Sequence, residues 1–217
     1  MPITNNNVLK LAIMDPYPLS RLGLKHITLA LEPGICIEAE GSCFKEIAQI
    51  LQSTHIDILV TELYGEQEDL AQGVTMLQAL CLIPDLRIII YTQSKNGQVL
   101  NMLNGFKQIS LISHFEALEP TLADLARALA NEKICSSLIQ GYIEVFKRQD
   151  AACLRQLTRC ERNILMLLFN GYSLVQISHQ INRSIKTVSC HKCNAMRKLG
   201  AKSDADLYLV MRDLFNR

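Results

Sequence analysis

The first 131 residues alternate short apolar runs with longer segments in which apolar residues recur every three or four positions. The apolar runs predict buried strands at 8–14, 35–41, 56–63, 86–92 and 109–113. The helical spacing lies at 19–31, 43–52, 74–83, 96–106 and 120–131. Strands that alternate regularly with helices predict a doubly wound parallel sheet with right-handed crossovers.

The residues after 157 carry only helical patterns. Thr158 and Glu161 are spaced as a capping box, and Gly171 follows the first apolar stripe. Ser173 then precedes a helix of about eight residues at 174–181, and Ser184 precedes a longer helix that Gly200 ends. Two such helices joined by Asn182-Arg183 predict a helix-turn-helix, and a final helix is expected from Ser203 or Asp204 to about Phe215.

The predicted fold class is therefore α/β plus all-α. A doubly wound (βα)5 domain is expected over 1–131, a connector over 132–156 and a four-helix helix-turn-helix domain over 157–217. The connector has more polar residues and no strand pattern, so a helix near 137–148 is the one element expected in it.

Charge divides the chain in the same way. Residues 151–217 hold 11 Lys and Arg against four Asp and Glu, a net charge of +7, whereas the first 150 residues carry −6. An acidic first half and a basic second half indicate two modules, the second of which faces a polyanion.

No targeting signal or membrane span is evident. No apolar run approaches the roughly 20 residues that span a bilayer, and MPITNNNVLK lacks the pattern of a signal peptide. The expected location is the cytoplasm, with no membrane partner. The cysteines are expected to be reduced thiols, because a disulfide framework is denser in a shorter secreted chain; they are Cys36, Cys43, Cys81, Cys135, Cys153, Cys160, Cys190 and Cys193.

The helix that follows Ser184 carries the candidate nucleic-acid site. Its core face is expected to hold Ile185, Val188, Ala195, Met196 and Leu199. Small and polar residues on the other arc would let the helix enter a major groove, with base contacts from Thr187, Ser189 and Cys190. Phosphate contacts are expected from Lys186, Lys192 and Arg197. The full candidate set is Ser184, Lys186, Thr187, Ser189, Cys190, Lys192, Cys193 and Arg197. A solvated basic face is the alternative interpretation.

A metal site is not expected at Cys190 and Cys193. A structural zinc ion needs four ligands, normally from two spaced pairs, and Cys153 and Cys160 do not form a second CxxC. No metal and no cofactor are therefore predicted.

The stretch TRCERNILMLLFNGYSLVQISHQINRSIKTVSCHKCNAMRKLGAKSDADL resembles the LuxR/FixJ (NarL) type of DNA-binding domain. Within that family, NRSIKTVS and AMRKLG look most similar to the enterobacterial capsule-synthesis (Rcs) regulators. The resemblance extends to the first domain as a receiver. The signature positions are Glu161, Gly171, Ile177, Lys186, Thr187, Val188, His191, Lys198, Leu199 and Gly200.

The resemblance implies a transcription regulator, an activator by expectation, that binds double-stranded promoter DNA. It also implies a homodimer, or a heterodimer with a related LuxR-type regulator, with RNA polymerase as a further candidate partner and the nucleoid as the place of action. The last helix of such domains often dimerises. A dimer surface is also expected as an apolar patch at Val99–Phe106 and Leu122–Leu129.

Receivers of this family place two acids after the first strand, an Asp after the third, a Thr or Ser after the fourth and a Lys after the fifth. Here Asp15 is followed by Pro16, Glu62 stands at the Asp position, Thr92 matches, and His114 replaces the Lys. The longer Glu side chain would displace the carboxylate from in-line attack. These four positions, Asp15, Glu62, Thr92 and His114, therefore predict a degenerate phosphorylation site without catalysis.

Several alternatives stay open from the sequence. Glu62 either mimics a phosphorylated Asp by placing charge further out, or is a relic at a solvated strand end, and a working phosphorelay receiver is the main functional alternative. A small-molecule sensor in the first domain is another. An enzyme is not expected, because no Gly-rich phosphate loop, nucleophile elbow or Cys-His pair is evident.

Overall fold

The computed structural model describes residues 8–215, apart from the side chains of residues 149–151, 153, 154 and 213–215. The N-terminal segment 1–7, in which no targeting signal was expected, and the Cys153 thiol thus lie outside the described part. The chain divides into two compact units, 1–145 and 146–217, and each is described by itself.

The first unit is built on a five-stranded sheet in the order β2-β1-β3-β4-β5, with every pair parallel. The prediction of a doubly wound α/β domain is confirmed. The three central strands are almost entirely buried, as expected for parallel strands covered on both faces. The strands are Leu9–Met14, Ile35–Gly41, Ile58–Thr61, Arg87–Thr92 and Ile109–Ser113.

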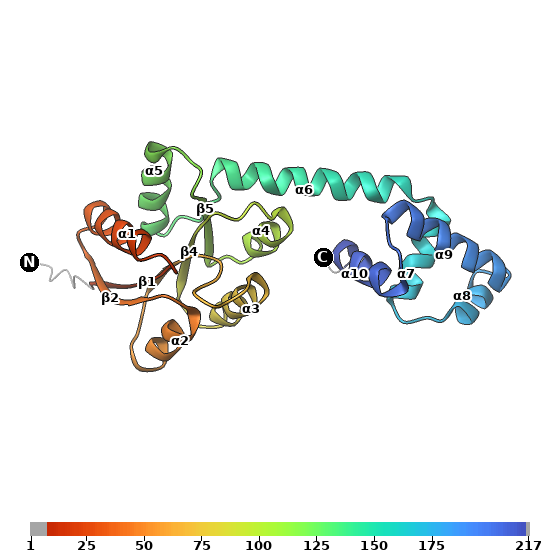
Figure 1. Ribbon diagram of the computed structural model, residues 1–217, viewed down its shortest axis with the longest axis horizontal. Helices are drawn as coiled ribbons and strands as arrows, with labels where there is room; N and C mark the ends of the chain where they lie inside the picture. The colour runs from red at the N-terminus through yellow and green to blue at the C-terminus, as the bar shows by residue number, and fades with distance from the viewer. Residues whose placement is uncertain (1–7, 216–217) are drawn as a thin grey trace, which may run out of the picture. The chain divides into compact units, whose positions relative to one another are not determined.

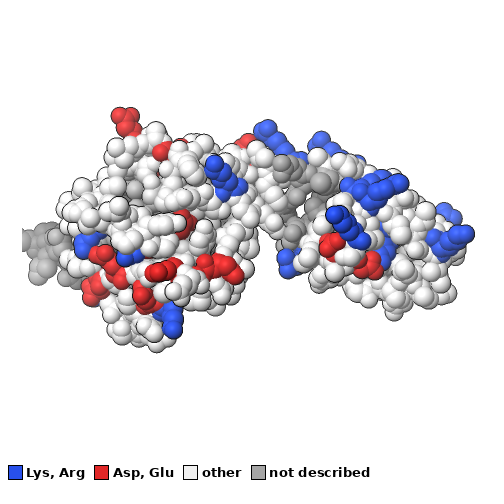
Figure 2. Space-filling model, viewed as in Figure 1, with Lys and Arg blue, Asp and Glu red and all other residues white. Residues whose placement is uncertain are grey.

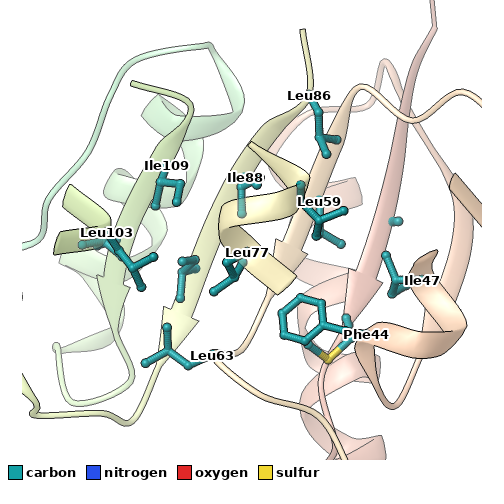
Figure 3. Packing of buried hydrophobic residues seen from close by; sticks show 14 of the residues in the cluster. Phe44, Ile47, Leu59, Leu63, Leu77, Leu86, Ile88, Leu103 and Ile109 are labelled. Carbon is teal, nitrogen blue, oxygen red and sulfur yellow. The ribbon is translucent and has the colours of Figure 1, made fainter. Parts of the chain in front are cut away.

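Helices cover both faces of this sheet (Figure 1). Because successive strand residues point to opposite faces, Met14 packs with α2, α3 and α4, whereas Ile13 packs with α1 and α5. Figure 3 shows the first of these cores, in which Phe44 and Leu77 lie over Leu59. The helices are α1 Pro18–Leu31, α2 Phe44–Ser53, α3 Leu70–Leu80, α4 Gly97–Asn104 and α5 Leu118–Leu129.

Among the strands and helices of the predicted sheet domain, the greatest shift from the expected bounds concerns α3. It begins at Leu70 rather than at residue 74, because Asp69 and Gln72 form a capping box that the apolar spacing alone does not reveal. It ends at Leu80, before Pro84. Strand β3 ends at Thr61, so Glu62 belongs to the loop that follows the strand.

Residues 132–145, which were predicted to be part of the connector, pack into the first unit. Cys135 forms a parallel bridge with Leu111 beside β5, and Ile134 is buried on the α1–α5 side of the sheet. Helix α6 then runs over Ser137–Gln156 and buries Ile139 and Ile143 on the other side. The expected helix at 137–148 is therefore present and longer.

In its described residues, the second unit contains the end of α6 and then four further helices, α7 Arg159–Phe169, α8 Leu174–Gln180, α9 Ile185–Leu199 and α10 Asp204–Phe215. The predicted caps are confirmed: Thr158, Ser173 and Ser184 each accept a backbone N–H of the first turn, and Gly200 ends α9 in the left-handed conformation. Helices α7, α8 and α9 share the apolar cluster of Ile164, Ile177 and Val188.

Among the described residues, none of the helices combines the length and the apolar composition that crossing a bilayer requires. None of the seven cysteines within the described part forms a disulfide, and those at 36, 160, 190 and 193 are exposed.

Candidate functional site

Four side chains form an exposed stripe along α9, which we call the α9 stripe: Lys186, Cys190, Cys193 and Arg197. Their spacing of four, three and four residues places them on one face of the helix. The opposite face holds Val188 and Ala195, both fully buried. Thr187 and Ser189 flank the stripe and are half-buried. The structure thus gathers most of the predicted candidate set on one surface.

Ser184 and Thr187 fix the start of α9. The Ser184 hydroxyl accepts the Thr187 backbone N–H at 3.1 Å and lies 2.8 Å from the Thr187 hydroxyl. Both hydroxyls are therefore engaged with one another in the first turn. The predicted role of Ser184 as an N-cap is confirmed, and its cap orients the turn that precedes the α9 stripe.

Lys192 does not lie on the α9 stripe. Its ammonium group lies 2.6 Å from the carboxylate of Asp204 at the start of α10, and its side chain is 15% exposed. The helical period of the sequence could have separated Lys192 from the stripe, because Lys192 lies one turn after the core residue Val188. Its expected phosphate contact therefore competes with an ion pair inside the unit.

Ile185 corrects a second expectation. It was assigned to the core face of α9, but it is 48% exposed. Ile185 is the first residue of the helix, and the cluster shared with α7 and α8 begins only at Val188. Further along α9, the helical period predicted the core face correctly, because Met196 and Leu199 pack against a second apolar cluster of this unit.

A short chain of polar contacts runs along α9 beside the stripe. The Arg197 guanidinium donates to the Asn194 side-chain oxygen at 3.3 Å, and the Asn194 amide donates to the Cys190 sulfur at 3.8 Å. Asn194 was outside the predicted candidate set, although its position on the polar arc could be read from the helical period. These contacts order two members of the α9 stripe.

Glu161 and Lys198 hold α9 against α7. Glu161 is only 3% exposed, receives the Thr158 N–H at 2.8 Å and lies 2.7 Å from the Lys198 ammonium. Burial alone would raise the pKa of Glu161, but the hydrogen bonds from Lys198 and Thr158 outweigh it and lower that pKa. Glu161 is therefore ionised, and the pair couples the helix cap to the position of α9.

The two units differ in surface charge, as the sequence indicates. Figure 2 shows this on the face in view, where acidic side chains gather over the first unit and Lys and Arg side chains predominate over the second. A basic, exposed helix after a short helix has the charge and shape that a nucleic-acid groove requires.

A second candidate site lies at the carboxyl edge of the sheet. Asp15, Glu62 and His114 directly follow β1, β3 and β5, and Thr92 is the last residue of β4. Parallel strands bring these ends to one edge. Asp15 and Thr92 are fully buried, Glu62 is 5% exposed, and His114 is half-buried. The four predicted residues therefore come together.

The Glu62 carboxylate points into the protein. One oxygen accepts the Leu63 N–H at 2.7 Å and the other accepts the Gln93 N–H at 3.1 Å. Burial raises the pKa of Glu62, although hydrogen bonds from the Thr92 side chain and from both backbone groups oppose the rise. The expectation of a solvated strand end was wrong, because Glu62 is 5% exposed and both of its carboxylate oxygens accept backbone N–H groups.

His114 is stacked against Tyr91, with ring centroids 3.8 Å apart, and its Nε2 lies 3.1 Å from the Tyr91 carbonyl oxygen. Nε2 is also 3.9 Å from the Glu62 carboxylate. Burial lowers the pKa of His114, with Asp15 and the Tyr91 carbonyl opposing this. The imidazole is therefore neutral near pH 7, and the contact with Glu62 is not an ion pair there.

The carboxylate oxygens at this edge already accept hydrogen bonds from within the first unit. The two Asp15 oxygens accept the Tyr17 N–H at 2.8 Å and the Ser20 hydroxyl at 2.6 Å, and both Glu62 oxygens accept backbone N–H groups. Pro16 supplies no ligand where a second acid would stand. Within the described residues, no group of three or more His, Cys, Asp or Glu side chains could hold a metal.

The expected dimer patch is only partly exposed on the first unit. Leu100, Leu103, Leu125 and Leu129 are buried in the two cores, whereas Val99, Phe106 and Leu122 are half-buried and Met102 is 36% exposed. Exposed apolar side chains instead occur near the starts of α1 and α5. They include Tyr17, Leu19, Leu22 and Leu118, and two of them, Tyr17 and Leu118, line a groove of about 470 Å³.

Comparison with known proteins bears directly on the second unit. Residues 155–211 match the family model described as bacterial regulatory proteins, luxR family. The helix-turn-helix unit is thus similar to luxR-family regulatory proteins. The match covers α7, α8 and α9 with their caps, and most of α10. The α9 stripe and the Glu161–Lys198 pair both lie within the matched residues.

The chain as a whole is similar to transcriptional regulators. It is 26% identical over 208 residues to the transcriptional regulatory protein RcsB of Escherichia coli K12, covering 93% of each chain. It is 51% identical over 64 residues to the transcriptional activator protein BglJ of the same strain, covering 27% of this chain and 28% of that protein. A structure of two RcsB dimers bound to two parallel DNAs matches with a TM-score of 0.57 at 22% identity, over 96% of this chain and all of that one. This last likeness supports the receiver-plus-helix-turn-helix fold.

Proposed function

We propose that this protein is a DNA-binding transcription regulator that acts without phosphorylation of its receiver-like unit. The observation that carries the proposal is the α9 stripe, which presents Lys186, Cys190, Cys193 and Arg197 on the exposed face of a helix within a luxR-family helix-turn-helix. A helix with small and cationic exposed residues can enter a major groove and contact phosphates beside it.

The similarity to RcsB, which has been determined as dimers bound to DNA, supports DNA as the partner. The match to BglJ, a transcriptional activator, supports activation of transcription as the direction of regulation. The neutralisation of phosphates by Lys and Arg would make the affinity fall steeply with salt.

Independence from phosphorylation is supported by the carboxyl edge. Glu62 is held inward by the Leu63 and Gln93 N–H groups, where it bridges the loops after β3 and β4. An inward carboxylate favours the interpretation of Glu62 as a former phosphate acceptor that now joins two loops, rather than as a charge that mimics phosphate outside. His114, neutral near pH 7, supplies no fixed cation for a phosphoryl group.

The dimer is the third part of the proposal. The protein acts as a homodimer or as a heterodimer with an RcsB-type regulator, and RNA polymerase is a further partner at promoters. Support comes from the RcsB dimers on DNA and from the exposed Tyr17, Leu19, Leu22 and Leu118 of the first unit. Tyr17 and Leu118 line the same groove, and exposed apolar side chains that lie together mark a candidate protein contact.

The decisive experiment measures DNA binding by the full-length protein, alone and mixed with E. coli RcsB, against fragmented genomic DNA followed by sequencing. Enrichment of defined promoter fragments is expected, and replacement of Lys186 and Arg197 by Ala should remove it. Equal recovery of all fragments at physiological salt would contradict sequence-specific binding. Enrichment only in the mixture would indicate that the heterodimer binds the promoters, and enrichment without RcsB would indicate that the homodimer binds them.

The phosphorelay alternative is tested separately. The protein and RcsB, as a positive control, are incubated with acetyl phosphate and Mg²⁺ and measured by intact-protein mass spectrometry. We expect no phosphate adduct on this protein. An adduct that Glu62→Gln removes would overturn the inactive assignment of this site.

A further inference from the structure

Ile185 leaves an apolar side chain exposed at the start of α9. It is 48% exposed, whereas Val188 and Ala195 of the same helix are fully buried. Its sequence neighbours Ser184 and Lys186 are polar and exposed. Ile185 is therefore an isolated apolar group on a polar surface next to the α9 stripe.

The position of Ile185 is well defined. The cap formed by Ser184 and Thr187 fixes the first turn of α9 on both sides of Ile185. A β-branched side chain in a helix strongly prefers one χ1 rotamer, so its methyl groups point in one direction. An apolar contact at this point would cost little conformational entropy, because the side chain is already ordered.

The chemistry of the major groove offers one apolar group on a base edge, the 5-methyl group of a pyrimidine. In a helix-turn-helix, the N-terminal residues of the second helix contact the base edges. Ile185 is the first residue of that helix and adjoins Lys186, a candidate phosphate contact. The apolar side chain and its place at the start of α9 therefore match a base methyl rather than a phosphate or a polar base edge.

We propose that Ile185 is a specificity-determining residue that contacts the 5-methyl group of one pyrimidine in the DNA site; this inference rests on the proposed DNA-binding function. The ligand class is a 5-methylpyrimidine, which thymine and 5-methylcytosine share. Removing one buried methyl group costs about 0.8 kcal/mol, which corresponds to roughly a fourfold loss of affinity.

The test begins with selection of binding sites from a random duplex library by the full-length protein, in whichever preparation binds, alone or with RcsB. Each thymine of the selected site is then replaced singly by deoxyuridine, which removes only the methyl group. Affinity is measured by fluorescence anisotropy for the wild type, Ile185→Ala and the control Met166→Ala. Met166 is 47% exposed on α7, so its substitution matches Ile185→Ala in exposure.

At one position, deoxyuridine is expected to weaken binding by the wild type and by Met166→Ala about fourfold, and to leave binding by Ile185→Ala unchanged within twofold. Replacing that thymine by cytosine and then by 5-methylcytosine separates the two sources of the methyl group. Recovery of about fourfold on methylation of cytosine assigns the contact to any 5-methylpyrimidine, and no recovery restricts it to thymine.

The inference is overturned if no deoxyuridine position weakens wild-type binding, or if the loss persists in Ile185→Ala. Circular dichroism of Ile185→Ala, and binding by Ile185→Val, which keeps the branched shape, exclude a folding defect as the cause of altered binding. Failure of the proposed function gives a different result, because no sequence would then be enriched by the wild type at all.

Discussion

Glu161 of α7 and Lys198 of α9 form an ion pair of 2.7 Å at a helix cap, with the carboxylate almost completely buried. The same carboxylate accepts the Thr158 N–H, so one side chain both starts α7 and anchors the helix that carries the α9 stripe. The orientation of the candidate DNA surface therefore depends on a contact between residues 37 positions apart.

Replacing Lys198 by Met should destabilise the second unit by about 1–3 kcal/mol, because the buried Glu161 carboxylate loses its cation. The folded-state pKa of Glu161 is lowered, so its contribution to stability is present above about pH 4.5 and is lost as pH falls through the folded-state value. Chemical denaturation followed by circular dichroism from pH 3 to 7 measures this. Glu161→Gln should lose that part of the pH dependence. If its free energy of unfolding instead varied with pH as in the wild type, the Glu161–Lys198 pair would contribute nothing to stability.

Lys186 and Lys192 provide a matched comparison of two lysines on one helix. Lys186 lies on the exposed α9 stripe, so Lys186→Ala should weaken binding to all sequences and reduce the slope of log affinity against log salt by about 1. Lys192 is paired with Asp204, so Lys192→Ala should leave that slope unchanged and cost less than about 1 kcal/mol of stability. Anisotropy titrations at several salt concentrations measure both slopes. Equal reductions would return Lys192 to the set of phosphate contacts.

Glu62 should make the first unit less stable as pH rises. Its folded-state pKa is raised above 4.5, so the folded state binds the extra proton and stability falls as pH increases from about 4.5 to the folded-state value. His114 contributes in the opposite sense, because its lowered pKa makes stability fall as pH drops below about 6.5. Denaturant titrations of the wild type and Glu62→Gln at the same pH values isolate the Glu62 contribution. If both proteins showed the same dependence of the free energy of unfolding on pH, that dependence would come from a group other than Glu62.

Gly73 permits the close approach of α3 to the loop that begins at Glu62. A Cβ atom at this position would lie 1.8 Å from the Leu63 carbonyl oxygen, so Gly73→Ala should cost about 3 kcal/mol or more. Gly23 in α1 has no atom within 4 Å of such a Cβ, and Gly23→Ala should stabilise by about 0.5–1 kcal/mol. Thermal unfolding of both variants measures the contrast. A mild effect at Gly73 would mean that α3 moves away easily.

The fold could be predicted largely from local patterns. The apolar period distinguishes the strands from the helices of the first unit, and residues such as Thr158, Ser173 and Gly200 mark helix ends through contacts with groups only a few positions away. The start of α3 was missed because the Asp69–Gln72 cap lies among polar residues before the apolar stripe. The predicted residues of the carboxyl edge gather as expected, because parallel strands end together.

The sequence by itself determined which elements form, in what order, and which residue types stand at the carboxyl edge and on α9, since these depend on period and on short-range capping. Only the tertiary structure decided that Glu62 turns toward Gln93, 31 positions away, that Lys192 pairs with Asp204, and that Ile185 remains outside the core. The physical reason is that each of these outcomes depends on which distant group lies within hydrogen-bonding or packing range, and the packing of the whole unit determines those distances.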